Sequence, residues 1–217
     1  MELRRRALFA FAFVLFAASV FGNSTSAKAS DKGAGAFVDR LGNKTISYLS
    51  NASATQEWRE DRLRELFREG FATDRIGRFV LGKYRRNASD TAVNEFVQVF
   101  EDYIVAFYAK QFQKFSGETF TVQKVIEAQA NKVNKDSMVM AKLVPANANE
   151  PLRVTFQVRK VGDDFKILDI RVEGVSLVLA QRDEFTTYIG NNGGKVESLT
   201  SALRQRLSGL ASSAPSK

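Results

Sequence analysis

The stretch LRVTFQVRKVGDDFKILDIRV, residues 152–172, consists of two runs of alternating apolar and polar residues joined by a short polar link. A period of two is typical of a β-strand with one buried and one solvated face. The link Gly162-Asp163-Asp164 has the length and composition found in β-hairpins. The stretch therefore predicts two antiparallel strands. The apolar residues that share one face of the first strand are Leu152, Val154, Phe156 and Val158.

Two further runs with the same period precede this hairpin, at residues 120–130 and 137–144. Together with the strands at 152–161 and 165–172 they predict an antiparallel sheet of about four strands. On both sides of this block the apolar spacing changes to three and four residues, which is typical of amphipathic helices. We therefore expect an α+β fold. The predicted helices cover residues 36–49, 58–71, 73–82, 89–115, 177–189 and 196–207.

The longest predicted helix, residues 89–115, carries more aromatic side chains than one neighbouring element needs. At 1.5 Å per residue it would be about 40 Å long. We expect its aromatic face to meet the apolar face of the sheet. The space between them is either a filled core, which the periodicity alone favours, or a dry cavity that takes an apolar ligand. The aromatic residues on that face are Phe96, Phe100, Tyr103, Phe107 and Phe112.

The first 29 residues have the layout of a secretory signal peptide. Three arginines precede an uncharged apolar run at residues 7–21, which at about 15 residues is too short to cross a bilayer. Ala27-Lys28-Ala29 has the small-x-small pattern of a cleavage site. We expect cleavage there and export to the bacterial periplasm. Residues 30–210 would then form a single domain and residues 211–217 a disordered tail.

The composition of the chain excludes several classes of chemistry. Its 217 residues include neither cysteine nor histidine, which removes thiol nucleophiles, disulfides, imidazole bases and the common transition-metal ligands. An enzyme of this composition would have to use carboxylates, lysine or tyrosine. Overall we expect no enzymatic activity, no cofactor and no metal. The formal net charge of +8 is not accompanied by a nucleic-acid-binding signature, so we expect no nucleic-acid partner.

Two acidic side chains near the last predicted strand are the candidates for catalysis that this composition leaves. Asp169 and Glu173 lie four residues apart, with Arg171 between them, and alternation places all three on one face. Two carboxylates can in principle do acid and base chemistry. Because nothing in the sequence marks a substrate cleft beside them, we favour an ion-pair network over catalysis.

A basic cluster follows the third predicted helix, at Lys83, Tyr84, Arg85 and Arg86. Guanidinium groups bind phosphate through forked hydrogen bonds, so the cluster is a candidate anion site. The alternative is an ordinary solvated surface, which is the commoner role of such a cluster.

Residues 78–85 read RFVLGKYR, and residues 169–177 read DIRVEGVSL. Single positions that belong to the same pattern are Phe96, Phe100, Tyr108, Arg182 and Phe185. In this order they resemble the MlaC-type family of periplasmic phospholipid-binding proteins, also called toluene-tolerance or ABC-transporter auxiliary proteins. The similarity covers residues 37–207, and the stretch 172–177 is its most specific part.

The resemblance implies a twisted antiparallel sheet wrapped by helices, loosely similar to nuclear-transport-factor-like folds, with an apolar cavity for acyl chains. It implies a monomeric carrier that shuttles phospholipid between an outer-membrane lipoprotein complex and an inner-membrane ABC transporter complex, with a role in outer-membrane lipid asymmetry. A related branch of the family is associated with hopanoid gene clusters, so a hopanoid is the alternative ligand. A structural adaptor of an ABC transport system that binds no lipid is the alternative function.

The apolar positions and the resemblance together place the acyl chains between the long helix and the apolar face of the sheet. The head group would lie at the mouth of this site, near Tyr84, Arg85 and Ser176. The basic residues Lys83, Arg85 and Arg86 would contact either the head group or a partner protein. The expected lipid-binding residues are Phe79, Val80, Tyr84, Phe96, Phe100, Tyr103, Phe107, Val154, Phe156, Val158, Val172 and Ser176.

Overall fold

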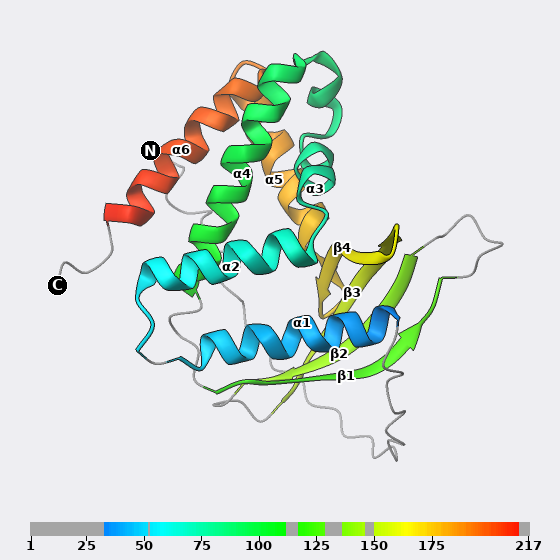
Figure 1. Ribbon diagram of the computed structural model, residues 1–217. Helices are drawn as coiled ribbons and strands as arrows, with labels where there is room; N and C mark the ends of the chain where they lie inside the picture. The colour runs from blue at the N-terminus through cyan, green and yellow to red at the C-terminus, as the bar shows by residue number, and fades with distance from the viewer. Residues whose placement is uncertain (1–32, 52, 112–116, 129–135, 146–149, 213–217) are drawn as a thin grey trace.

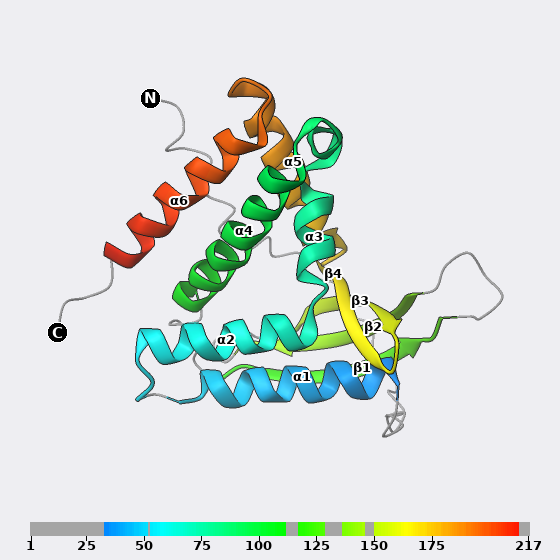
Figure 2. The ribbon, with the colours of Figure 1, turned by 45° about the horizontal axis from the view of Figure 1, so that its top comes forward.

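The computed structural model shows a sheet covered on one face by a helix, with a group of further helices beside it (Figure 1). A second view shows α1 (Ala34–Leu49) and α2 (Gln56–Gly70) side by side, with α4 (Asp90–Gln111) and α6 (Val196–Ser212) rising away from the sheet (Figure 2). The predicted signal peptide lies outside the described part of the chain. None of the described helices combines the length and the apolar character that crossing a bilayer requires. The described residues are 33–51, 53–111, 117–128, 136–145 and 150–212.

Within the described residues, five antiparallel strands form one sheet in sequence order. The predicted α+β fold and antiparallel sheet are thus confirmed, with a fifth strand of two residues added. The predicted hairpin is also present, because Val161 pairs with Asp164 across a two-residue loop. Gly162 in this loop has φ +62°, a conformation that glycine adopts readily. The strands are β1 Thr119–Ile126, β2 Asp136–Val144, β3 Leu152–Val161, β4 Asp164–Val172 and β5 Val175–Ser176.

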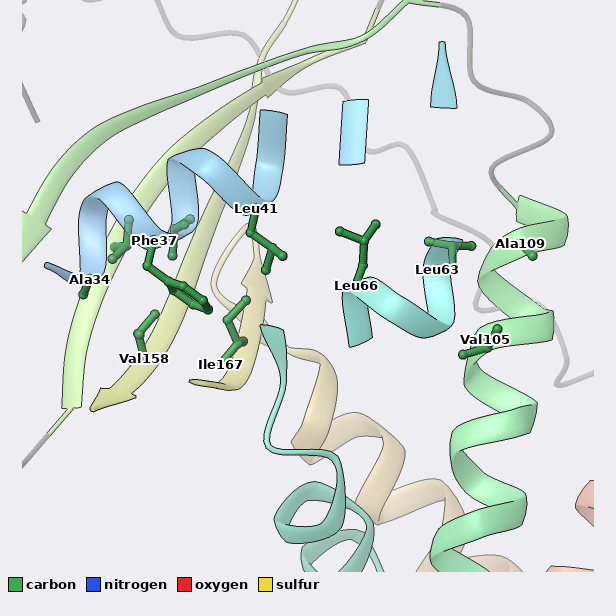
Figure 3. Packing of buried hydrophobic residues seen from close by; sticks show 11 residues of the cluster. Ala34, Phe37, Leu41, Leu63, Leu66, Val105, Ala109, Val158 and Ile167 are labelled. Carbon is green, nitrogen blue, oxygen red and sulfur yellow. The ribbon is translucent and has the colours of Figure 1, made fainter. Parts of the chain in front are cut away.

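Helix α1, Ala34–Leu49, covers the apolar inner face of the sheet (Figure 3). Two glycines seven residues apart allow this helix to approach β1 closely. A Cβ atom at Gly35 would lie 2.6 Å from Cγ2 of Val125, and one at Gly42 would overlap the ring of Phe120. We call the apolar cluster that α1 forms with the sheet and with α2 the sheet cluster. Its buried residues on the strands are Val139, Val158 and Ile167.

The remaining helices form a second apolar cluster, which we call the helical cluster. Phe96, Phe100 and Phe185 meet at its centre, with ring centroids 5.8 to 6.1 Å apart. Helix α6 continues to Ser212, two residues into the segment expected to be a disordered tail, and residues 213–217 lie outside the described residues. The helices are α2 Gln56–Gly70, α3 Thr73–Val80, the 3-10 helix η1 Gly82–Asn87, α4 Asp90–Gln111, α5 Leu177–Asn191 and α6 Val196–Ser212.

The expected packing of the long helix against the sheet is wrong. Phe96 of α4 lies in the helical cluster, whereas Val158 of β3 lies in the sheet cluster. Of the described α4 residues, Val105 and Ala109 near its C-terminal end belong to the sheet cluster. The reason is that α1 already occupies the inner face of the sheet. Phe112 lies outside the described residues.

Candidate functional site

A series of aromatic side chains leads from α4 across α2 to strand β4. The ring centroids of Phe107 and Tyr108 are 5.4 Å apart, and those of Tyr108 and Phe67 are 6.3 Å apart. Phe67 in turn stacks on Phe71 at 4.7 Å, and Phe71 forms a bridge with Ile167 of β4. The four aromatic residues, which we call the aromatic chain, are only half-buried. Part of their apolar surface therefore remains accessible at this point.

The inner face of the sheet also keeps apolar surface that α1 leaves half-buried. Phe120 on β1 and Phe156 on β3 meet edge to face, with ring centroids 5.9 Å apart. These two rings and the aromatic chain member Phe67 pack against the same sheet cluster. We therefore treat the aromatic chain and this part of the inner face as one region, the junction. Other half-buried apolar residues of the inner face include Leu143, Leu152, Ile170 and Val172.

The junction is an environment of low polarity. Burial, and to a smaller extent the neighbouring Tyr103, raises the pKa of the Tyr108 phenol above its ordinary value. A phenol resists ionisation where water cannot solvate the resulting anion. The same shielding favours an apolar ligand over a charged one.

Two hollows in the described part of the chain differ in character. The smaller one lies between α1 and α2, beside Tyr48 and Trp58, and has a volume of about 10 Å³. That volume holds at most a single water molecule. The larger one has a volume of about 640 Å³ and lies where α3, η1, the start of α4 and α5 meet. Neither hollow is the apolar cavity that the resemblance implied.

The larger hollow is basic, and we call it the basic hollow. The guanidinium of Arg182 lies over the ring of Phe79, 4.6 Å from its centroid, and Phe79 is 41% exposed. The ammonium of Lys83 lies 5.2 Å from the centroid of the Tyr84 ring. The basic cluster found in the sequence is thus part of a concave site. The lining residues are Arg78, Phe79, Gly82, Lys83, Arg85, Arg86, Ala88, Asp90 and Arg182.

The structure divides the expected lipid-binding residues between several places. Val80, Phe96 and Phe100 are buried in the helical cluster, and Phe79 lies in the basic hollow. Tyr103 and Phe107, whose ring centroids are 5.9 Å apart, connect the helical cluster to the aromatic chain. The expected residues that lie on the inner face of the sheet are Val154, Phe156, Val158 and Val172.

The expected head-group site is not formed, because its residues lie at opposite ends of α5. Ser176 caps the first turn of this helix, where its hydroxyl oxygen accepts a hydrogen bond from the amide of Leu179 at 3.0 Å. Tyr84 lies beside Gly190, near the last turn. Fourteen residues of helix correspond to about 20 Å. Ser176 is therefore a helix cap next to the sheet, whereas Tyr84 packs against the helical cluster.

The acidic residues near the last strand have separate ion-pair partners. Asp169 accepts a hydrogen bond from Nε of Arg171 at 3.3 Å. Glu173 is held by both the backbone amide and the guanidinium of Arg153, and the backbone hydrogen bond is the main cause of its lowered pKa. Each carboxylate thus forms its own ion pair among the described residues, where we expected one ion-pair network. Within the described ranges, no group of three or more acidic residues could hold a metal ion.

Sequence reasoning missed Phe67 and Phe71 as site residues. Both residues fall within the predicted helix 58–71, but Phe71 lies just past the end of α2, beside β4. Sequence reasoning also placed Arg182 in the family pattern without linking it to the basic cluster. The signal that could have found the first pair is the excess of aromatic side chains at the end of α2.

The described residues thus form an α+β fold in which an antiparallel sheet is covered by helices, with half-buried aromatic side chains where the two layers meet. The sequence matches the family model described as MlaC protein over residues 39–205. Because this match includes most of the chain, the chain belongs to the MlaC family.

A solved structure supports the same fold. It is that of the phospholipid-binding protein from Ralstonia solanacearum in complex with a phospholipid, and it matches this chain with a TM-score of 0.68. The match covers 83% of this chain and 99% of that one, at 18% sequence identity. At this identity the likeness shows that the two chains share a fold.

Proposed function

We propose that this chain is a periplasmic lipid carrier that binds phospholipid acyl chains at the junction. The observation that carries the proposal is the half-buried aromatic surface between α2, α4 and the sheet, within a fold shared with a protein solved in complex with a phospholipid. Membership of the MlaC family points in the same direction. The carrier would pass lipid between an outer-membrane lipoprotein complex and an inner-membrane ABC transporter complex, as a monomer and without catalysis.

The energetics of lipid transfer explain why such a carrier needs a dry site. Burial of one methylene is worth about 0.8 kcal/mol, so exposing two chains of about 16 carbons to water would cost about 25 kcal/mol. A carrier must therefore enclose both chains almost completely. Since its interior and the bilayer are similar in polarity, the net free energy of transfer is small. The direction of lipid transport would then be set by docking of the carrier to its partner complexes and by ATP use in the transporter.

The packing of α4 suggests how the chains would be accommodated. This helix contributes to the sheet cluster near its C-terminal end, at Val105 and Ala109, while Phe96 belongs to the helical cluster. Movement of α2 and the end of α4 away from the sheet would widen the junction and leave the helical cluster intact. In this proposal the chains contact Phe156 and Val172 on the sheet and Phe107 on α4.

The proposal is tested by mass spectrometry of the folded protein. The chain purified from the periplasm should carry one or more non-covalent lipids, and a delipidated sample should take up phospholipid from vesicles. A hopanoid mass in place of a phospholipid mass would select the alternative ligand. A protein that shows only the mass of the chain and takes up no lipid would be the structural adaptor instead.

The export of the protein is tested separately. Secretion with cleavage after Ala29 predicts that the protein recovered from the periplasm begins at Ser30. N-terminal sequencing of the mature protein checks this, and a protein that retains residues 1–29 would contradict it.

A further inference from the structure

The basic hollow contains more positive charge than its neighbours neutralise. Arg78 is already paired, because its Nε donates to both carboxylate oxygens of Asp74 at 2.9 and 3.0 Å and its Nη2 donates to Asn94 at 2.6 Å. Asp90 is the one acidic residue in the lining. In the described part of the chain, no acidic side chain lies within ion-pair distance of the remaining cations, which are Lys83, Arg85, Arg86 and Arg182.

Arg182 is held at the wall of the basic hollow by its surroundings. Its guanidinium stacks on Phe79, and stacking leaves the N–H groups at the edge of the plane free to donate. Gly82 has φ +56°, and a Cβ atom there would lie 2.7 Å from Cγ2 of Thr186 and 3.3 Å from Nε of Arg182. The absence of a side chain at Gly82 thus lets η1 approach α5, which brings the basic cluster next to Arg182.

The start of α4 adds a further contribution of the same sign. Ser89 caps this helix, since its hydroxyl oxygen accepts a hydrogen bond from the amide of Ala92 at 3.1 Å. Ala88 and Asp90, on either side of the cap, line the basic hollow. The amino end of a helix carries a partial positive charge and favours anions nearby. Asp90 offsets part of this positive charge. The four cations Lys83, Arg85, Arg86 and Arg182 still exceed it.

We propose that the basic hollow is a binding site for a phosphoryl group, separate from the junction. Its volume is in the range of small-ligand sites, and forked guanidinium groups match the geometry of phosphate oxygens. Fully buried Phe96 and Phe185 fill the helical cluster, so acyl chains do not reach the hollow through it. The inference does not depend on the proposed function, because a phosphoryl group can be presented by a membrane lipid or by a soluble phosphate ester.

The test compares two triple variants that lose the same charge. Lys83→Gln with Arg85→Gln and Arg86→Gln removes the basic cluster. The control variant replaces three exposed lysines of the sheet, Lys124, Lys142 and Lys160, with glutamine. Titration calorimetry with inorganic phosphate and glycerol 3-phosphate, at low salt in a phosphate-free buffer, measures binding of soluble esters. Sedimentation with vesicles of phosphatidylcholine, with and without phosphatidylglycerol, measures binding of lipid phosphates.

We expect the basic-cluster variant to lose at least about tenfold in affinity and the control variant to stay within about twofold. Binding of the soluble esters identifies a discrete phosphate site, whereas binding of vesicles alone identifies a membrane-presented head group. Equal losses in both triple variants, or no binding by the unmodified chain, would overturn the proposal.

Lipid retention in mass spectra should be the same in both variants. A chain that binds phosphate but carries no lipid would refute the carrier and leave this site standing.

Discussion

Arg159 and Asp136 face each other across the β2–β3 pair and form a two-point ion pair, from Nε to Oδ1 at 2.5 Å and from Nη2 to Oδ2 at 3.0 Å. Gln157, on the same face of β3, donates to Oδ2 at 2.6 Å. The Asp136 side chain is only 3% exposed. A carboxylate so deeply buried is unfavourable without such donors. The ion pair therefore favours the strand register in which Asp136 of β2 lies opposite Arg159 of β3.

This ion pair predicts acid sensitivity. Burial alone would raise the pKa of Asp136, but the hydrogen bonds from Arg159 and Gln157, together with the positive charges of Arg159 and Arg75, hold that pKa below its ordinary value. Since the pKa is lower in the folded state than in the unfolded state, the contribution to stability is present above about pH 4 and is lost as the pH falls through the folded-state pKa. Asp136→Asn should therefore destabilise the fold by roughly 1–3 kcal/mol at pH 7 and flatten its acid dependence.

Thermal denaturation followed by circular dichroism at pH 7, 5 and 3 checks this prediction. The exposed Asp163 of the hairpin loop offers the matched control, because Asp163→Asn also removes one carboxylate. Parallel pH profiles for the unmodified chain and Asp136→Asn would contradict the expected linkage.

The close approach of α1 to β1 predicts that an added methyl group destabilises the protein. Gly42→Ala places a Cβ atom against the ring of Phe120, so we expect a loss of about 1–3 kcal/mol despite the higher helix propensity of alanine. Gly209→Ala in α6 is the control, since a Cβ atom there meets nothing within 4 Å and should stabilise the helix by up to about 1 kcal/mol. Chemical denaturation measures both changes, and effects of the same sign would show that the contact at Gly42 is looser than described.

Lipid retention should depend on Phe156, whose half-buried ring lies on the inner face of β3. Phe156→Asp introduces a carboxylate that must be desolvated beside an acyl chain, so retained lipid should fall at least about tenfold. Thr155→Asp is the matched control, because its side chain points to the outer face of the same strand. Native mass spectrometry on samples whose circular dichroism shows a folded protein compares the two. Full retention by folded Phe156→Asp would move the lipid site away from the sheet.

The apolar surroundings of Tyr108 can be detected directly. Its phenol should ionise above the ordinary value near 10, so the ultraviolet difference between the unmodified chain and Tyr108→Phe should develop only in strong alkali. Because the folded state holds this proton more tightly than the unfolded state, the contribution to stability decreases as the pH rises above about 10. A difference spectrum already complete at pH 10 would indicate a solvated hydroxyl and a more polar junction.

The strands and helices were predictable because each is encoded by local spacing. The period of two in residues 152–172 predicted β3, β4 and their hairpin, and all three are present. The two-residue strand β5 was not predicted, because it is too short for any period to show. It exists because Glu173, with φ 49°, and Gly174, with φ 85°, turn the chain back onto β4.

The candidate site was predictable only in part. Phe156 and Val158 lie on the apolar face of β3, as alternation indicated. The sequence could not predict which helix packs on this face of the sheet, because α1, α2 and α4 all present apolar side chains. The basic cluster was visible as a run of residues, but its concave shape depends on Arg182, which lies about 100 positions further along the chain.

The sequence by itself determined the fold class, the antiparallel sheet and the polarity of each face, since these follow from hydrogen bonding and solvation within a few neighbouring residues. Only the tertiary structure decided that α1 covers the sheet while α4 packs mainly with other helices, and that α5 separates Ser176 from Tyr84. Contacts of this kind depend on how closely two distant surfaces fit. Here the close fit requires glycine, which has no side chain. Gly35 and Gly42 allow α1 to approach the sheet, and Gly82 allows η1 to approach α5.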